Sequence, residues 1–116
     1  MQKTFNDCII GDIIYSVSFS YNTLDKWEII NIDDKENYLK MELKKLYNDV
    51  NSFRNFYSES KTLYFEKQVS FKKISDDMND ESYWCVNKDS LKERYKYWVN
   101  NRRNIEKMFN KLIESV

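Results

Sequence analysis

The chain has 116 residues, of which 41% are hydrophobic, 33% charged and 16% aromatic, and its formal net charge is zero. It contains no histidine, which is the usual general base at neutral pH, and its one glycine excludes a glycine-rich phosphate loop. The composition predicts one folded domain over residues 1–116, in a cytoplasmic protein that is not an enzyme and has no cofactor, metal site or membrane span.

The zero net charge conceals an uneven distribution along the chain. Residues 1–87 contain 11 basic and 15 acidic residues, whereas residues 88–116 contain 8 basic and 4 acidic residues. Such an asymmetry indicates surfaces of opposite charge, which bear on the choice of partner. The two cysteines, Cys8 and Cys85, each lie in an apolar run, so we expect buried thiols rather than a disulfide or zinc ligands.

Residues 12–32 are expected to form a β-hairpin. Apolar side chains occupy every second position of the first strand, at Ile13, Tyr15, Val17, Phe19 and Tyr21. Residues 22–26 carry turn-forming side chains, and residues 27–32 have the composition of a second strand. One face of this hairpin is therefore expected to be buried.

Residues 34–57 show two competing periodicities. Leu39, Met41 and Leu43 alternate as they would in a strand. Helical spacing explains a longer set, which comprises Leu39, Leu43, Leu46, Tyr47, Val50, Phe53 and Tyr57. Because it explains seven residues against three, we predict a helix here, capped at its start by Asp33 or Asp34.

Two more strands are expected at residues 63–71 and 83–86. Lys67 falls on the inward face of the first of them, where it indicates a bulge, a break or a sheet edge. An acidic loop separates the two strands, and it lacks the spacing and the glycine of a calcium loop. Its carboxylates form a candidate contact patch for a partner, at Asp76, Asp77, Asp80 and Glu81.

Residues 89–116 predict one long helix, which begins with a capping box of Ser90 and Glu93. Its apolar residues follow a heptad pattern that Val99 and Ile113 broaden. The pattern comprises Leu91, Tyr95, Trp98, Ile105, Phe109, Leu112 and Val116. A helix of about 26 residues would be about 39 Å long, which exceeds what so small a domain needs. Either it bends at Asn100–Asn101 or its end projects towards a partner.

Arg102 completes the heptad pattern at a position where an unpaired arginine is costly. Three explanations are open. Arg102 pairs with a carboxylate and sets the register, it marks a break after Asn101, or it is exposed at a contact site for a partner.

The same helix carries a basic stripe on the side away from most of the apolar pattern. The stripe covers an arc of about 100° and consists of Lys92, Lys96, Arg103, Lys107 and Lys111. Such a stripe binds a phosphate backbone or an acidic protein surface, or it is simply a solvated face. Tyr97 points away from the apolar pattern and suits a protein interface, where aromatic residues are enriched.

The segment Ile10-Gly11-Asp12-Ile13-Ile14-Tyr15 resembles the first strand of small SH3-like barrel proteins, which are frequent in phages and mobile elements. That resemblance implies a small barrel. In composition the chain also resembles small phage-encoded inhibitors of host defence, such as anti-CRISPR proteins. This second resemblance implies a short, non-catalytic protein that acts by contact.

We therefore expect an α+β fold in the order ββαββα, with an antiparallel sheet of about four strands and two helices. The alternative is an SH3-like small barrel with helical additions. The expected function is that of a non-catalytic interaction protein, which inhibits or modulates a partner such as a nucleic-acid-handling host defence complex. One alternative is direct nucleic-acid binding through the basic stripe, and another is a homodimer formed through the heptad pattern of the C-terminal helix.

Overall fold

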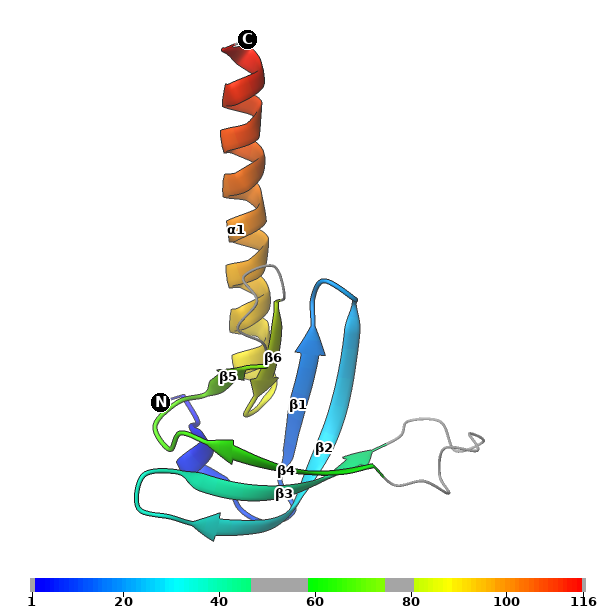
Figure 1. Cartoon of the computed structure of the whole chain (residues 1–116), viewed down its shortest axis with the longest axis vertical. Coiled ribbons are helices and arrows are strands. Elements are labelled where there is room, and N and C mark those ends of the chain that lie inside the picture. Colours follow the sequence, from blue (N-terminus) through cyan, green and yellow to red (C-terminus); the bar gives the residue numbers. More distant parts are fainter. Residues whose placement is uncertain (1, 47–58, 75–80, 116) are drawn as a thin grey trace, which may run out of the picture.

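The computed structural model describes residues 2–46, 59–74 and 81–115. Six antiparallel strands form one curled sheet in the order β4-β3-β2-β1-β6-β5, and one long helix follows it (Figure 1). In chain order, the elements are the 3-10 helix η1 (Phe5–Asp7), β1 (Ile13–Ser18), β2 (Thr23–Asp34), β3 (Leu39–Leu46), β4 (Ser60–Phe65), β5 (Phe71–Lys73), β6 (Ser82–Cys85) and the α-helix α1 (Lys88–Glu114).

The predicted N-terminal hairpin is confirmed. β1 and β2 pair antiparallel, with Ile14 opposite Trp27 and Val17 opposite Leu24. β2 begins at Thr23, earlier than expected, because Asn22 turns the chain with a φ of 54° and the ladder starts at the next residue. Asparagine tolerates this left-handed conformation better than most residues. The turn is therefore shorter than the one predicted from composition.

The predicted order ββαββα is wrong. Residues 39–46 form strand β3, which pairs along its whole length with β2 and places Ile29 opposite Leu43. Asp34, predicted as a helix cap, is the last residue of β2. The short alternation at Leu39, Met41 and Leu43 is the pattern that the fold follows, because all three side chains are buried on one face of the sheet. The remainder of the predicted helix, residues 47–58, lies outside the described residues.

The two faces of the sheet bury two different clusters. The larger one combines residues from η1, from the four strands β1 to β4 and from β6, and it consists of Phe5, Cys8, Ile14, Trp27, Ile29, Leu39, Met41, Leu43, Phe65, Trp84 and Val86. The smaller one lies on the opposite face beneath α1, where Leu91 packs against Tyr15, Val17, Tyr83 and Cys85. Both cysteines are buried free thiols, as predicted.

Lys67 marks a break in the strand predicted at residues 63–71, which was one of the three possibilities predicted for it. It lies between β4 and β5, and its ammonium forms an ion pair with Asp34. β6 confirms the strand predicted at residues 83–86. The alternative prediction of a small barrel is also wrong. In the described chain, β4 and β5 are the outer strands of an open, curled sheet.

The N-terminal segment packs against β4 and the connection between β4 and β5. The backbone amides of Phe5 and Asn6 donate to the carbonyl oxygens of Val69 and Lys67, both at 2.9 Å. The Phe5 ring is fully buried and stacks on Phe65, with 4.2 Å between ring centroids. Residues 2–8 therefore complete the larger core instead of forming a free terminus.

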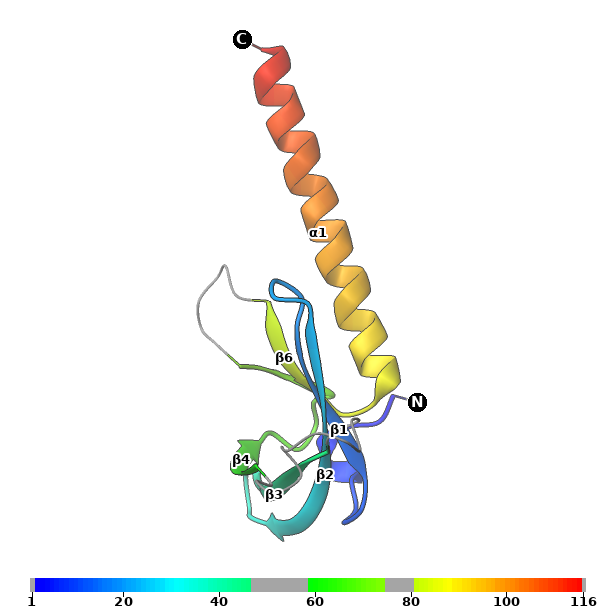
Figure 2. The same ribbon diagram turned by 90° about the vertical axis from the view of Figure 1, so that its right-hand side faces the viewer.

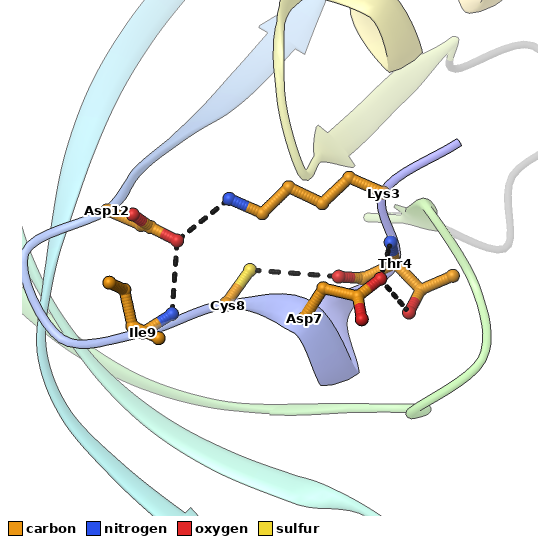
Figure 3. Close-up of polar contacts among 6 residues, drawn as sticks. All are labelled: Lys3, Thr4, Asp7, Cys8, Ile9 and Asp12. Atoms are coloured by element: carbon orange, nitrogen blue, oxygen red, sulfur yellow. Dashed lines mark hydrogen bonds and ion pairs between the residues drawn. The ribbon is translucent and has the colours of Figure 1, made fainter. Parts of the chain in front are cut away.

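Polar contacts hold this segment in place, as Figure 3 shows. The Lys3 ammonium contacts the Asp12 carboxylate at 2.8 Å, and the Ile9 amide donates to the same oxygen at 3.0 Å. The Asp7 carboxylate accepts from the Thr4 amide at 3.0 Å and from the Thr4 hydroxyl at 3.1 Å. We call residues 3–12, with these contacts, the N-terminal latch.

The latch predicts a loss of stability in acid. Partial burial would raise the pKa of Asp12, but the hydrogen bonds from Lys3 and from the Ile9 amide outweigh it and lower that pKa. The Thr4 amide and hydroxyl lower the pKa of Asp7. A carboxyl with a lowered folded-state pKa stabilises the fold above its unfolded pKa and loses that contribution as pH falls through the folded value. The free energy of unfolding should therefore decrease below about pH 4.

Substitution of Asp12 by asparagine tests this prediction. We expect Asp12→Asn to lower the free energy of unfolding at pH 7 by about 0.5–1 kcal/mol and to flatten its decrease between pH 4 and pH 2. Urea titrations followed by tryptophan fluorescence measure both quantities. The control is Asp33→Asn, which removes a half-exposed carboxylate paired with Lys35. An acid profile unchanged in Asp12→Asn but flattened in Asp33→Asn would contradict the prediction.

Candidate functional site

The candidate site is the C-terminal helix α1, whose start is firmly attached to the sheet. The Asn87 side chain caps the helix by accepting from the Ser90 amide at 2.9 Å. The Ser90 hydroxyl is buried and donates to the Ser70 carbonyl oxygen at 2.7 Å. The predicted capping box of Ser90 and Glu93 is therefore wrong, because the helix begins three residues earlier and Ser90 anchors it to the connection between β4 and β5.

Aromatic contacts extend this attachment over the next two turns. The Phe19 ring, just after β1, stacks on Trp98 with 5.4 Å between centroids and contacts Tyr95 at 5.8 Å. The Arg94 guanidinium lies 3.9 Å from the centroid of the Phe71 ring. Val99 is the last residue of α1 that is partly buried. The sheet therefore supports the helix from Lys88 to Val99.

Beyond Val99 the helix leaves the sheet. Every residue from Asn100 to Ser115 is exposed, and Figures 1 and 2 show this part of α1 extending past the tip of the β1–β2 hairpin. We call residues 100–115 the projecting half, which is about 22 Å long. The helix is continuous through Asn100–Asn101. Of the two outcomes expected from its length, projection is therefore the correct one.

The basic stripe lies on the outer side of α1. All of its predicted members are exposed, namely Lys92, Lys96, Arg103, Lys107 and Lys111. Within the described part of the chain, none of the five forms an ion pair. Tyr97 is 54% exposed and lies beside the Arg94 guanidinium at 5.3 Å, so its predicted outward orientation is confirmed. The stripe leaves five cations available to a partner.

The heptad pattern is divided between two environments. Its first residues, Leu91, Tyr95 and Trp98, contact the sheet. Its later residues lie on the projecting half and remain between 57% and 68% exposed, and we call this set the apolar seam. It consists of Ile105, Met108, Phe109, Leu112 and Ile113. Met108 was not predicted as part of this surface, because it lies at the edge of the heptad pattern. Val116, which was predicted, lies outside the described residues.

Arg102 lies where the supported part of α1 meets the projecting half. It is exposed, and its guanidinium is 4.9 Å from the centroid of the Trp98 ring, a cation–π contact. It forms no ion pair with any described carboxylate, although it shares a pocket of about 400 Å³ with Phe19, Glu81 and Ile105. The break after Asn101 is wrong, because α1 is continuous there, and Arg102 is exposed on its surface.

The acidic patch is only partly described. Asp76, Asp77 and Asp80 lie outside the described residues. Glu81 is half-buried and accepts a hydrogen bond from the Tyr83 hydroxyl. Burial, followed by this bond to Glu81, raises the pKa of Tyr83 far above its usual range. Glu81 therefore has a structural contact within the smaller core, in addition to its place beside Arg102.

A pocket on the face of the sheet opposite α1 was not predicted from the sequence. It has a volume of about 270 Å³ and places the ammonium groups of Lys45 and Lys61 at 5.8 and 5.5 Å from the Trp27 ring. Lys45 also pairs with Asp25 and with Glu59. Strand alternation at residues 41–45 would have located Lys45 opposite Trp27, had that segment not been assigned to a helix. These internal pairings indicate a structural role.

The two cysteine thiols are buried within the fold. Burial raises the pKa of both thiols, Cys8 and Cys85, to about 11, so each stays protonated and unreactive at neutral pH. Within the described ranges, no group of three or more potential metal ligands is present. The described helices also lack the combination of length and apolar character that crossing a bilayer requires. Comparisons with protein families, with curated proteins and with solved structures found no match for this chain.

Proposed function

We propose that this chain is a non-catalytic interaction protein that binds an acidic surface of a partner protein through the basic stripe of α1. The observation that carries the proposal is the exposure of all five stripe cations without an ion pair in the described chain. One continuous helix places these cations along one side, and three of them, Arg103, Lys107 and Lys111, lie on the projecting half. Charges arranged in this way steer association and select partners by complementary charge.

The protonated state of the two buried thiols supports a non-catalytic role, because a thiol with a pKa of about 11 is a poor nucleophile at neutral pH. A protein without histidine acts more readily by occupying a surface than by transferring protons. The class of partner that we propose is a nucleic-acid-handling complex of a host, in keeping with the resemblance in composition to small phage-encoded inhibitors.

Direct nucleic-acid binding is the second candidate, and the same stripe favours it, since cations on one helix face can neutralise phosphates. The charge of the rest of the molecule opposes it. The described residues up to Asn87 include 10 basic and 11 acidic side chains, so the sheet adds no positive field to that of the helix. A protein partner is therefore the stronger proposal.

Charge reversal on the projecting half tests the proposal. We expect the triple variant Arg103→Glu, Lys107→Glu and Lys111→Glu to bind its partner roughly 3- to 150-fold more weakly, from the loss of three exposed ion pairs at about 0.2–1 kcal/mol each. The matched control reverses three other lysines, Lys40, Lys73 and Lys88, and should keep the affinity. Partners are captured from host extract with the tagged wild-type chain, and affinities are then measured by interferometry at 50 and 200 mM salt.

Nuclease treatment of the extract separates the two candidates. A partner protein that stays bound after digestion, and is lost only with the stripe variant, supports the proposal. Direct binding of a 20-base-pair DNA or a single-stranded RNA at 50 mM salt, with a steep loss at 200 mM, would favour the second candidate instead. Equal binding by the stripe variant and the control variant would contradict both.

A further inference from the structure

The apolar seam is the one large feature of the described chain that the basic stripe leaves without a role. Its five side chains continue, past the edge of the sheet, the same helix face that packs on Phe19 nearer the start of α1. Soluble proteins rarely expose such a contiguous apolar patch unless a partner covers it. The seam lies roughly opposite the basic stripe around the helix, so the two surfaces can be occupied independently.

We propose that the seam is covered by the projecting half of a second copy of this chain, arranged antiparallel, with a twofold axis level with residues 105–109. Arg102, Ile105, Phe109 and Leu112 follow the alternating three- and four-residue steps that allow two helices to interlock side chains, and Met108 and Ile113 flank them. The proposal does not depend on the partner of the basic stripe.

The antiparallel arrangement makes the seam complementary to itself. Ile105 of one copy lies opposite Phe109 of the other, so a branched aliphatic residue meets an aromatic ring on both sides of the axis. Leu112 lies opposite Arg102, and Met108 lies beside its own counterpart. Ile113 then lies beside the partly buried Val99 of the second copy. Every exposed seam residue therefore has a contact, and large residues are not forced against each other.

A parallel arrangement conflicts with the structure in two ways. First, the helix face that carries the seam is already covered by the protein's own sheet as far as Trp98, which stacks on Phe19. A parallel copy in register would bring its own sheet into that same space. Second, Arg102 would face Arg102 of the other copy, and like charges repel. In the antiparallel pair the two sheets lie at opposite ends, and each Arg102 keeps its position beside Trp98.

The size of the seam predicts a weak dimer. Ten side chains, five from each copy and each between 57% and 68% exposed, can remove on the order of 500 Å² of apolar surface from water. Such an apolar area is well below that of a standard stable interface, so only weak self-association is expected. The dissociation constant of the dimer is therefore expected to be on the order of 100 µM. The dimer would present two basic stripes on its outer sides.

Sedimentation velocity of the full chain between 5 and 500 µM tests the occupant of the seam. Wild type is expected to shift from monomer to dimer over this range. The variant Phe109→Asp with Leu112→Asp should remain monomeric, and because both positions are exposed its circular dichroism at 5 µM should be unchanged. The matched control, Asn100→Asp with Asn110→Asp, adds the same charge on the outer face and should dimerise.

Single cysteines introduced into the seam test the orientation. Met108→Cys should form an intermolecular disulfide at 200 µM, because this position meets itself near the axis, whereas Leu112→Cys should not, because its counterparts lie about 15 Å apart along the axis. The parent chain, with its two buried thiols, is the control. Cross-linking of Leu112→Cys alone would overturn the antiparallel arrangement.

A wild-type chain that stays monomeric at 500 µM would overturn the second copy as the occupant. Flotation with vesicles of phosphatidylglycerol and phosphatidylcholine, performed on the same samples, tests whether a lipid surface covers the seam instead. Vesicle binding by a monomer would assign the seam to a lipid surface. The outcome for the basic stripe is read separately, from the charge-reversal variants, so failure of either proposal leaves the other one testable.

Discussion

Replacing Phe5 by alanine is expected to lower the free energy of unfolding by about 3–5 kcal/mol, a large share of the stability of a domain this size. The Phe5 side chain is fully buried and stacks on Phe65, with 4.2 Å between ring centroids. The amide of the same residue donates to the Val69 carbonyl oxygen. Its truncation leaves a cavity where the N-terminal latch packs against β4 and the connection between β4 and β5.

Urea denaturation followed by tryptophan fluorescence measures the effect, at 5 µM protein so that self-association does not contribute. Phe109→Ala is the matched control, since it removes the same ring from a position that is 60% exposed. We expect the control to change the free energy of unfolding by less than about 0.5 kcal/mol. Equal effects of the two substitutions would show that the N-terminal segment is not part of the core.

Replacing Trp84 by alanine is expected to have an effect of similar size, about 3–5 kcal/mol. This β6 residue is 4% exposed and contacts Trp27 at 5.3 Å and Phe65 at 6.3 Å, both edge to face. It therefore joins the β5–β6 side of the curled sheet to the strands on the other side. Losing it removes both aromatic contacts and leaves a large cavity between the two halves of the sheet.

The conservative variant Trp84→Phe distinguishes packing from general disruption. A phenylalanine retains part of the aromatic contact and a smaller cavity, so we expect a loss of only about 1–2 kcal/mol. Thermal and urea unfolding, both followed by far-ultraviolet circular dichroism, give the comparison. Similar losses in the alanine and phenylalanine variants would show that the Trp27–Trp84 and Phe65–Trp84 contacts contribute little, which would contradict this description of the core.

Local patterns predicted several elements correctly. The alternation in β1, the intrusion of Lys67 and the apolar composition of β6 all indicated what the structure contains. Each of these signals arises from one or two neighbouring strands and needs no knowledge of distant contacts. The long helix was equally predictable, because its heptad pattern extends over most of its length. Its cap was misplaced by three residues, since Asn87 and Ser90 are both acceptable capping residues.

The segment around Leu39 and Leu43 could not be assigned from local pattern alone. Both residues satisfy a helical and a strand period, and the helical pattern was longer. Pairing with β2 decided the outcome, because it buries Leu39, Met41 and Leu43 together on the face closed by Phe5. No proline or second glycine marked the boundary. Tertiary contacts override weak local preferences in such segments.

The same distinction applies to the candidate site. An apolar face and, on the other side, a basic stripe could be predicted for the last helix, because both follow from helical geometry alone. That the apolar face is covered as far as Trp98 and open from Ile105 onwards depends on the packing of the helix on the sheet. The physical reason is length, since the sheet that supports the helix ends before the helix does. Residues with one periodicity therefore acquired two roles, as core near the start and as exposed surface near the end.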